Sequence, residues 1–284
     1  MSYRITYSVL YLLSLLPFWV LYGLSNFLYF IFYKVIGYRK KIVRENLAQS
    51  FLTKTHEERL SIEKKFYRNL CDSIVEGIKM LSASQKTLNK RMSANWQLAD
   101  ETFPGQNAVI MVSHQFNWEW ATLLATPNMD KQFLGPYLPI TNAVFDRIFS
   151  KIRCRFGTIV VPVNDMPKSI KVYKNQNVLW GFVADQTPAD TKRCAWVDFF
   201  NRKTAFAKGA ELLARRYNYP VFFGEFIKEK RGQYSINIKL TFENPNQTRD
   251  GEITTAYVRF LENSIKRQPE NWVWSHRRWK HSYP

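Results

Sequence analysis

The sequence predicts an α/β protein: a central, mainly parallel sheet flanked by helices, preceded by a hydrophobic membrane-anchoring helix or helical hairpin. Three observations lead to this prediction. From residue 108 onward, strand-like apolar runs alternate with amphipathic helical segments, the pattern of a mainly parallel sheet covered by helices. Residues 5–33 carry no charged side chain, and a cluster of cations follows at once. We therefore expect a membrane anchor over residues 1–36, a helical lead-in over 37–104, and an α/β domain over 105–284.

The uncharged N-terminal run is long enough to enter a membrane, and the residues behind it predict its orientation. Pro17 interrupts the run and suits the first turn of a second helix that reaches about Val35. A kinked span and a hairpin within one leaflet both fit, and a helix buried in a soluble core is the alternative. The cations that follow face the cytoplasm by the positive-inside rule; they are Lys34, Arg39, Lys40, Lys41 and Arg44.

A capping box, Thr-His-Glu-Glu at residues 55–58, opens a long helix that we expect to reach about Leu81. Its predicted apolar stripe consists of Leu60, Phe66, Leu70, Ile74 and Ile78. Pro104 and Gly105 end the polar stretch that follows. Beyond them we expect strands at residues 108–112, 132–134, 158–161, 178–183, 221–227 and 234–242, and helices from 118, at 143–152, 166–173, 203–217 and 252–267.

The charge balance predicts an anionic partner. The chain holds 41 basic and 23 acidic residues, for a formal net charge of +18. Acidic lipid headgroups, an acidic protein and nucleic acid would all suit this charge, but no nucleic-acid-binding motif accompanies it, so we expect no nucleic-acid partner. The three cysteines lack zinc or redox spacing, which indicates a reducing compartment and no metal site.

The best candidate for chemistry follows the apolar run at residues 108–112, which is typical of a strand buried on both faces. The strand delivers His114 to its carboxyl end, where open α/β sheets bind their ligands. Asn117 can cap a helix that begins at Trp118, so Glu119 would lie in its first turn. A bend between His114 and Glu119 lets the carboxylate reach the imidazole. The pair therefore predicts a histidine base, oriented by a carboxylate, that takes a proton from a hydroxyl.

Two later segments add polar groups that could bind a substrate. Asp185 and Gln186 leave the strand at 178–183 in a polar turn, where either could hold a polar acceptor or order the site, unless the segment is a plain turn. Arg202, Lys203 and Thr204 lie at the expected start of the helix 203–217. Backbone N–H groups at a helix start, together with these cations, suit a phosphate or an oxyanion.

The C-terminal segment N-W-V-W-S-H-R-R-W-K, residues 271–280, interleaves tryptophans with cations that include Arg277 and Arg278. Such a composition also describes a nucleic-acid patch or an interfacial anchor. The segment is similar to the terminal W-x-H-R-R-W/F-K block of one protein family, and S-H-Q-F-N-W-E at residues 113–119 resembles that family's histidine motif. This family is the bacterial lipid A biosynthesis acyltransferases, within the wider His-four-residues-Asp/Glu superfamily of lysophospholipid acyltransferases. The Asp-Gln turn at 185–186 also looks like the lipid A branch, since glycerolipid acyltransferases carry Pro-Glu-Gly-Thr-Arg-Ser there.

The resemblance implies a membrane-associated O-acyltransferase on the cytoplasmic side of the cell inner membrane, working without a metal or cofactor. The donor would be an acyl-acyl carrier protein or acyl-CoA, and the acceptor a hydroxyl of an anionic lipid A precursor. His114 would be the base, Glu119 would orient it, and Arg153, where the family places an arginine, would assist at the carbonyl. Substrate contacts would come from Asn117, Asp185, Gln186, Arg202, Lys203, Thr204, Arg277 and Arg278. Two alternatives stay open: the same chemistry on a lysophospholipid or aminolipid, and a non-catalytic basic binding protein of the membrane.

Overall fold

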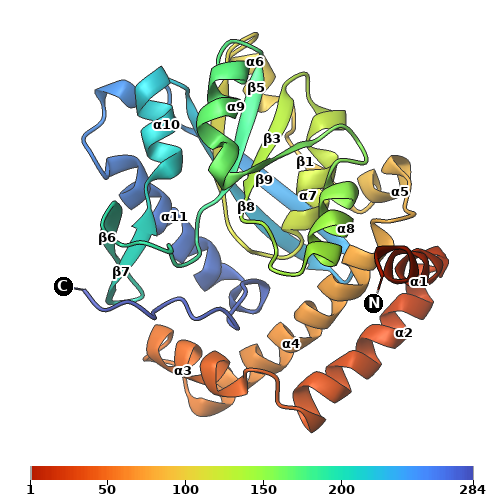
Figure 1. The fold of residues 1–284 in the computed structure, drawn as a ribbon. Coiled ribbons are helices and arrows are strands. Elements are labelled where there is room, and N and C mark those ends of the chain that lie inside the picture. Colours follow the sequence, from red (N-terminus) through yellow and green to blue (C-terminus); the bar gives the residue numbers. More distant parts are fainter. Residues whose placement is uncertain (1, 284) are drawn as a thin grey trace.

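The computed structural model describes residues 2–283 and confirms the predicted α/β architecture, with a mostly parallel central sheet flanked by helices (Figure 1). Strands join this sheet in the order β1-β9-β8-β2-β5-β3-β4. All neighbours are parallel except β8 and β9, which form an antiparallel hairpin. The strands are β1 (Met92–Ala94), β2 (Ala108–Val112), β3 (Gln132–Tyr137), β4 (Ile159–Pro162), β5 (Val178–Val183), β8 (Val221–Lys230) and β9 (Gln233–Phe242).

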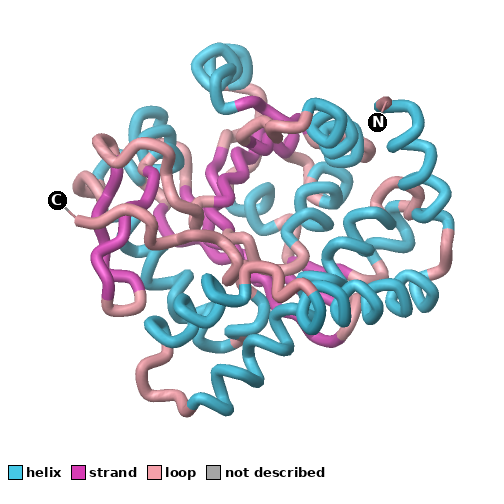
Figure 2. The backbone as a smooth tube through the Cα atoms, turned by 60° about the horizontal axis from the view of Figure 1, so that its bottom comes forward, coloured by secondary structure: helices cyan, strands magenta, loops and turns pink. Residues whose placement is uncertain are grey.

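The helices follow the predicted order closely, and Figure 2 shows how they surround the strands. Before β2 they are α1 (Tyr3–Leu15), α2 (Phe18–Tyr29) with a π-helical continuation (Phe30–Val35), α3 (Lys40–Ser50), α4 (His56–Lys79), α5 (Gln85–Asn89) and α6 (Leu98–Thr102). After β2 they are α7 (Trp118–Leu124), α8 (Ala143–Arg153), α9 (Met166–Tyr173), α10 (Gly209–Tyr217) and α11 (Glu252–Arg267). The lead-in segment is thus mainly helical, but it also supplies the edge strand β1.

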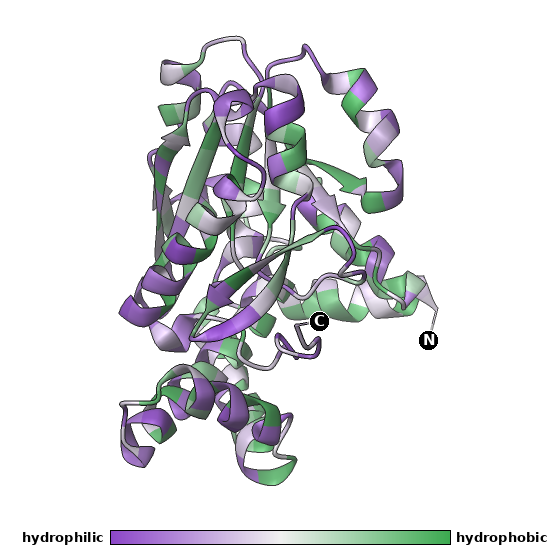
Figure 3. Ribbon diagram, turned by 90° about the vertical axis from the view of Figure 1, so that its left-hand side faces the viewer, coloured by the Kyte–Doolittle hydropathy of each residue, from purple (hydrophilic) through white to green (hydrophobic). Residues whose placement is uncertain are grey.

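The central strands are buried because both faces of the sheet are covered. In β2 and β5 all but the last residues are buried, and Figure 3 colours the central strands as hydrophobic. Such continuous apolar runs are what a parallel strand between two helical layers requires. The ends of these strands therefore stay fixed relative to one another, which matters for the residues that follow them.

The expected helix over residues 203–217 is wrong in its first third. Residues 194–207 form an antiparallel hairpin, β6 (Cys194–Phe199) and β7 (Arg202–Ala207), and only then does α10 begin. Phe200 and Asn201 make the two-residue turn with φ of 49° and 59°, the left-handed geometry that such hairpins need. The alanines and lysines of this stretch suit a helix locally, but pairing with β6 overrides that preference.

The predicted apolar stripe of α4 is also wrong in most of its members. Of that stripe only Phe66 is buried, whereas the buried face of the helix carries Asp72 and Glu76 among its apolar residues. The helix has its predicted capping box, in which Thr55 and Glu58 bond each other's backbone N–H groups. The stripe fails because α1 and α2 cover a second side of α4, so the helix has no single inner face.

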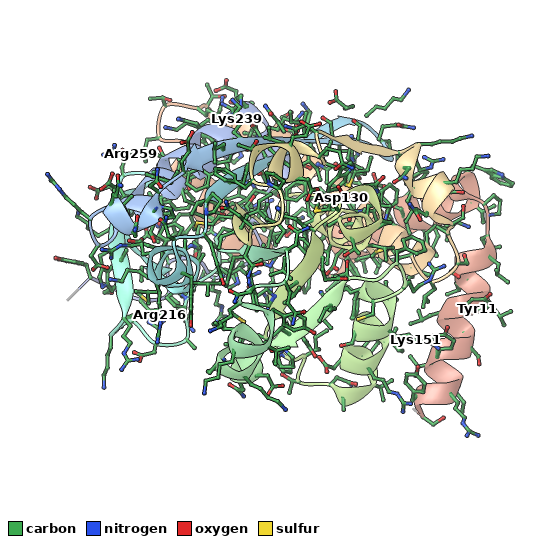
Figure 4. The ribbon with its side chains drawn as sticks, turned by 90° about the horizontal axis from the view of Figure 1, so that it is seen from above. Tyr11, Asp130, Lys151, Arg216, Lys239 and Arg259 are labelled. Atoms are coloured by element: carbon green, nitrogen blue, oxygen red, sulfur yellow. The ribbon has the colours of Figure 1, made fainter. Side chains whose placement is uncertain are left out.

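The N-terminal helices lie against α4 and α8 (Figure 1). Residues 18–35 form one helical segment long and apolar enough to cross a membrane. Leu21 and Ser25 on its inner side are buried, and the Lys79 ammonium donates hydrogen bonds to the Ser14 and Leu16 carbonyls at the end of α1. On the other side of α1, Figure 4 shows Lys151 of α8 next to that helix, where its Nζ lies 4.4 Å from the Tyr7 ring centroid.

We predict that Gly181→Ala destabilises the sheet by about 1–3 kcal/mol, the usual effect of overpacking. A Cβ at this position in β5 would overlap the ring of Phe133. Equilibrium denaturation in detergent measures the change. Phe133→Leu should restore part of the loss in the double variant, and Gly209→Ala is the control, since nothing lies within 4 Å of its Cβ. A Gly181→Ala protein as stable as wild type would contradict this packing.

Candidate active site

The ends of β2 and β5 bring His114 and Asp185 together. The two strands are parallel with Val112 opposite Val183, so the residues two places further on are also neighbours. The His114 Nδ1 atom lies 2.6 Å from the Asp185 Oδ1 atom, and the His114 backbone N–H donates to the same carboxylate at 3.1 Å. The carboxylate therefore fixes both the backbone and the ring of His114.

Asp185 is a buried carboxylate whose charge is compensated by hydrogen bonds. Its side chain is 1% exposed, and the Trp272 indole donates to Oδ2 at 2.6 Å. Burial raises the pKa of the Asp185 carboxyl, but the His114 ring and the hydrogen bonds outweigh burial, so the pKa lies below its ordinary value. An ionised Asp185 makes Nδ1 the proton-bearing nitrogen of a neutral His114.

The other side of the His114 ring is open. Within residues 2–283 no group forms a hydrogen bond with Nε2, and the side chain is 20% exposed. The ring packs edge-on against Trp118 with centroids 5.1 Å apart. The arrangement leaves Nε2 as the free nitrogen of an oriented ring, the position from which a histidine can accept a proton from a bound hydroxyl.

The expected partner of His114, Glu119, forms a different pair. Its two carboxylate oxygens accept hydrogen bonds from the Arg153 Nε and Nη2 atoms at 2.9 and 2.5 Å. Glu119 lies in the first turn of α7, as expected, but its side chain meets the last turn of α8. The prediction that Glu119 orients the imidazole is thus corrected. Glu119 orients Arg153, and Asp185 is the carboxylate that orients the His114 ring.

The turn between β2 and α7 is held from the C-terminal side. Gln115 accepts hydrogen bonds from Ser113 and Ser264 at 2.8 and 3.1 Å. The Phe116 backbone exchanges two hydrogen bonds with Asn271, each 3.0 Å long. Asn117 caps α7 as predicted, accepting from the Trp120 N–H at 3.1 Å. Residues 113–117, which we call the catalytic turn, are therefore fixed by contacts far away in the sequence.

The C-terminal block 271–280 supports the site rather than forming it. Besides Trp272, which bonds Asp185, His276 accepts a hydrogen bond from the Thr187 N–H at 3.1 Å. Burial lowers the pKa of the His276 imidazole to about 4, so this second histidine is neutral at physiological pH. It fixes the turn after Asp185 and, since its Nε2 is an acceptor there, offers no free base.

Most of the remaining predicted substrate contacts bond protein groups. Thr204 and Arg278 are buried and bonded to protein groups, as is Asn117. The Arg202 Cζ atom lies over the Trp279 ring, 3.4 Å from its centroid, and Lys203 pairs with Asp198. Arg202, Lys203 and Thr204 belong to a strand instead of a helix start, so no helix N-terminus accompanies them. The exposed members of the predicted set are Gln186, Lys203 and Arg277.

Three residues that the sequence did not single out hold the site: Glu76, Tyr257 and Trp272. Tyr257 donates a hydrogen bond to the Val112 carbonyl at 2.6 Å, at the end of β2, and Glu76 bonds Asn117 at 2.8 Å. Glu76 lies on the buried face of α4 beside Val75, one turn after the buried Asp72. A carboxylate in such a position needs partners.

We predict a coupling free energy of about 1–3 kcal/mol between Glu119 and Arg153. It is obtained from the free energies of unfolding in a double-mutant cycle with Glu119→Gln and Arg153→Gln. The reason is that each single change leaves a partly buried charge without its partner. The matched cycle of Glu119→Gln with His114→Ala should show a smaller coupling. A larger coupling of Glu119 to His114 than to Arg153 would restore the pairing expected from the sequence.

Comparisons with known proteins identify the family of this chain. Among solved structures, the 1-acyl-sn-glycerophosphate acyltransferase PlsC from Thermotoga maritima is similar over 96% of this chain and 100% of its own, with a TM-score of 0.39 and 12% identity. A comparison with curated proteins gave no match. The model of the bacterial lipid A biosynthesis acyltransferase family matches residues 3–281. The chain therefore belongs to this family of acyltransferases.

Proposed function

We propose that the protein transfers a fatty acyl chain from a thioester donor to a hydroxyl of a lipid A precursor-type glycolipid. The observation that carries the proposal is the His114 ring, held by the buried Asp185 through Nδ1 and open at Nε2. A hydroxyl is too weakly acidic to attack a thioester unaided, so it needs such a base beside it. The family to which the chain belongs supports a lipid A precursor as the acceptor.

The reaction follows from this geometry. The Nε2 atom takes the acceptor's hydroxyl proton as the oxygen attacks the thioester carbonyl, and a carbon–oxygen bond forms. The tetrahedral intermediate then collapses, the carbon–sulfur bond breaks, and the imidazolium returns its proton to the leaving thiolate. Asp185 stabilises the imidazolium while it lasts, as the aspartate of a serine-protease triad does.

Arg153 supplies the charge that the developing oxyanion needs. The Arg153 Nε and Nη2 atoms donate to Glu119, so the Arg153 Nη1 atom is left for another ligand. Because the ion pair and the Phe149 and Tyr137 rings hold the guanidinium, little reorganisation is needed when the negative charge appears. In this proposal Glu119 acts on the reaction through Arg153.

The charge of the protein favours acyl carrier protein as the donor and an anionic glycolipid as the acceptor. A net charge of +18 attracts acidic partners. The cations of α3 and the loop before it, including Arg39, Lys40 and Lys41, lie directly after the segment that we propose enters the membrane. We infer that this end of the protein lies at the cytoplasmic face of the inner membrane.

The function is tested by incubating purified protein with acyl-acyl carrier protein or acyl-CoA and a lipid A precursor or lysophospholipid, with products read by mass spectrometry. We expect acylated glycolipid from the carrier-protein donor. His114→Ala should lower the single-turnover rate by about 10²–10⁴-fold, and Asp185→Asn by up to about 10⁴-fold. Their combination should add little, because Asp185 acts through His114. Full activity of folded His114→Ala would overturn the mechanism, and acylation of the lysophospholipid alone would overturn the acceptor.

The N-terminal helices give a further prediction, that binding to anionic vesicles depends on their exposed aromatic side chains. Trp19, Phe27 and Phe30 are 77%, 59% and 54% exposed. Replacing all three by Gln should weaken partitioning by at least about tenfold, since each buried aromatic contributes roughly 1.5–3 kcal/mol. The matched control replaces Leu52, Val172 and Leu212, exposed apolar residues outside residues 1–36, and should leave binding unchanged. Equal effects of both triple variants in vesicle flotation would contradict this surface.

A further inference from the structure

Glu76 is a buried carboxylate at the junction of the membrane-proposed helix, the sheet and the catalytic turn. Its side chain is fully buried. Oε1 accepts a hydrogen bond from Tyr22 of α2 at 2.9 Å, and Oε2 accepts from Asn117 and from Tyr234 of β9, each at 2.8 Å. The donors are all neutral, and the Lys228 ammonium stabilises the carboxylate charge without a hydrogen bond to it. Burial raises the pKa of the Glu76 carboxyl to about 7.

Asp72, one helical turn earlier, shows what an ordinary buried carboxylate looks like in this protein. It accepts from Ser25 of α2 at 2.7 Å, and it pairs with Arg231 and Lys228 at 2.6 and 3.4 Å. It thus attaches α2 to α4 and to the β8–β9 turn, but none of its partners belongs to the catalytic turn. Glu76 differs because one of its partners, Asn117, does.

Asn117 connects Glu76 to the site. Its Oδ1 atom caps α7 while its Nδ2 atom donates to Glu76, so both functions of the amide are used. Along the chain, Asn117 lies between His114 and Glu119. Trp120 adds a second attachment, its indole donating to the Glu76 carbonyl at 3.2 Å. A shift of Asn117 would therefore move the base and the Arg153 pair relative to each other.

We propose that Glu76 is a positioning residue, which holds the catalytic turn at the spacing that acyl transfer needs by tying Asn117 to α2 and β9. Only the expected change in kcat rests on the proposed function. The structural part of the inference, that Glu76 holds residues 113–119 in place, stands apart from the reaction. Because misplacing reacting groups by about 1 Å costs on the order of 10²-fold in rate, a modest shift of the turn is enough to be measured.

The test compares two variants that break the contact from either end. Glu76→Leu removes the acceptor, and Asn117→Ser keeps a good helix cap but is too short to reach Glu76. We expect each to lower kcat by about 10–100-fold with KM for the thioester little changed. The double variant should lose no more than the worse single one, since both changes break the same link.

Asp72→Asn is the matched control, because it also weakens the attachment of α2 but leaves Asn117 untouched. It should lower the melting temperature with little effect on kcat. Hydrogen exchange of the peptide covering residues 113–119 supplies a readout without turnover, and it should be faster in Glu76→Leu than in Asp72→Asn. Equal kcat and equal exchange in these two variants would overturn the role of Glu76. A wild-type protein inactive on every thioester, with the exchange difference present, would instead overturn the proposed function.

Discussion

The parallel register of β2 and β5 is the constraint on which the rest of the site depends. With Val112 opposite Val183, the residues two places beyond each strand must meet, and these are His114 and Asp185. A carboxylate buried at that point would be costly without donors. The donors come from the His114 backbone and ring and from Trp272. The C-terminal segment must therefore fold back across the strand ends, which explains why Trp272 and Trp274 are buried instead of lying on the surface.

Two carboxylates carry the link between the N-terminal helices and the domain. Asp72 and Glu76 bind Ser25 and Tyr22 of α2, so one side of this apolar helix docks through hydrogen bonds while Trp19 and Phe27 on its outer side stay exposed. Hydrogen bonds to a buried carboxylate are stronger than those between neutral groups. A helix held in this way keeps its position against the catalytic turn while its outer side remains apolar. The fold thereby joins a membrane-compatible surface to the site without a flexible linker.

Much of the fold could be predicted because its signals are local. The strands at 108–112 and 178–183, the helices at 166–173 and 252–267, and the capping box at Thr55 follow from short apolar runs, periodicity and capping. The failures share one cause, a distant partner that overrides a local preference. Residues 202–207 became a strand because β6 pairs with them, and α4 lost its predicted stripe because α1 and α2 cover a second side of it.

For the site, the sequence by itself determined which residue types stand at the strand ends: His114 and Asp185 after buried strands, and Glu119 in the first turn of a capped helix. Only the tertiary structure decided their pairing. A spacing of five residues with a bend between them suggested that His114 and Glu119 meet. Instead the imidazole bonds Asp185, two residues beyond β5, and the Glu119 side chain points from α7 toward Arg153 of α8. Sequence spacing describes distance along one chain segment. Hydrogen bonds between side chains depend on which strands are adjacent and which helix faces meet, and those are properties of the packed sheet.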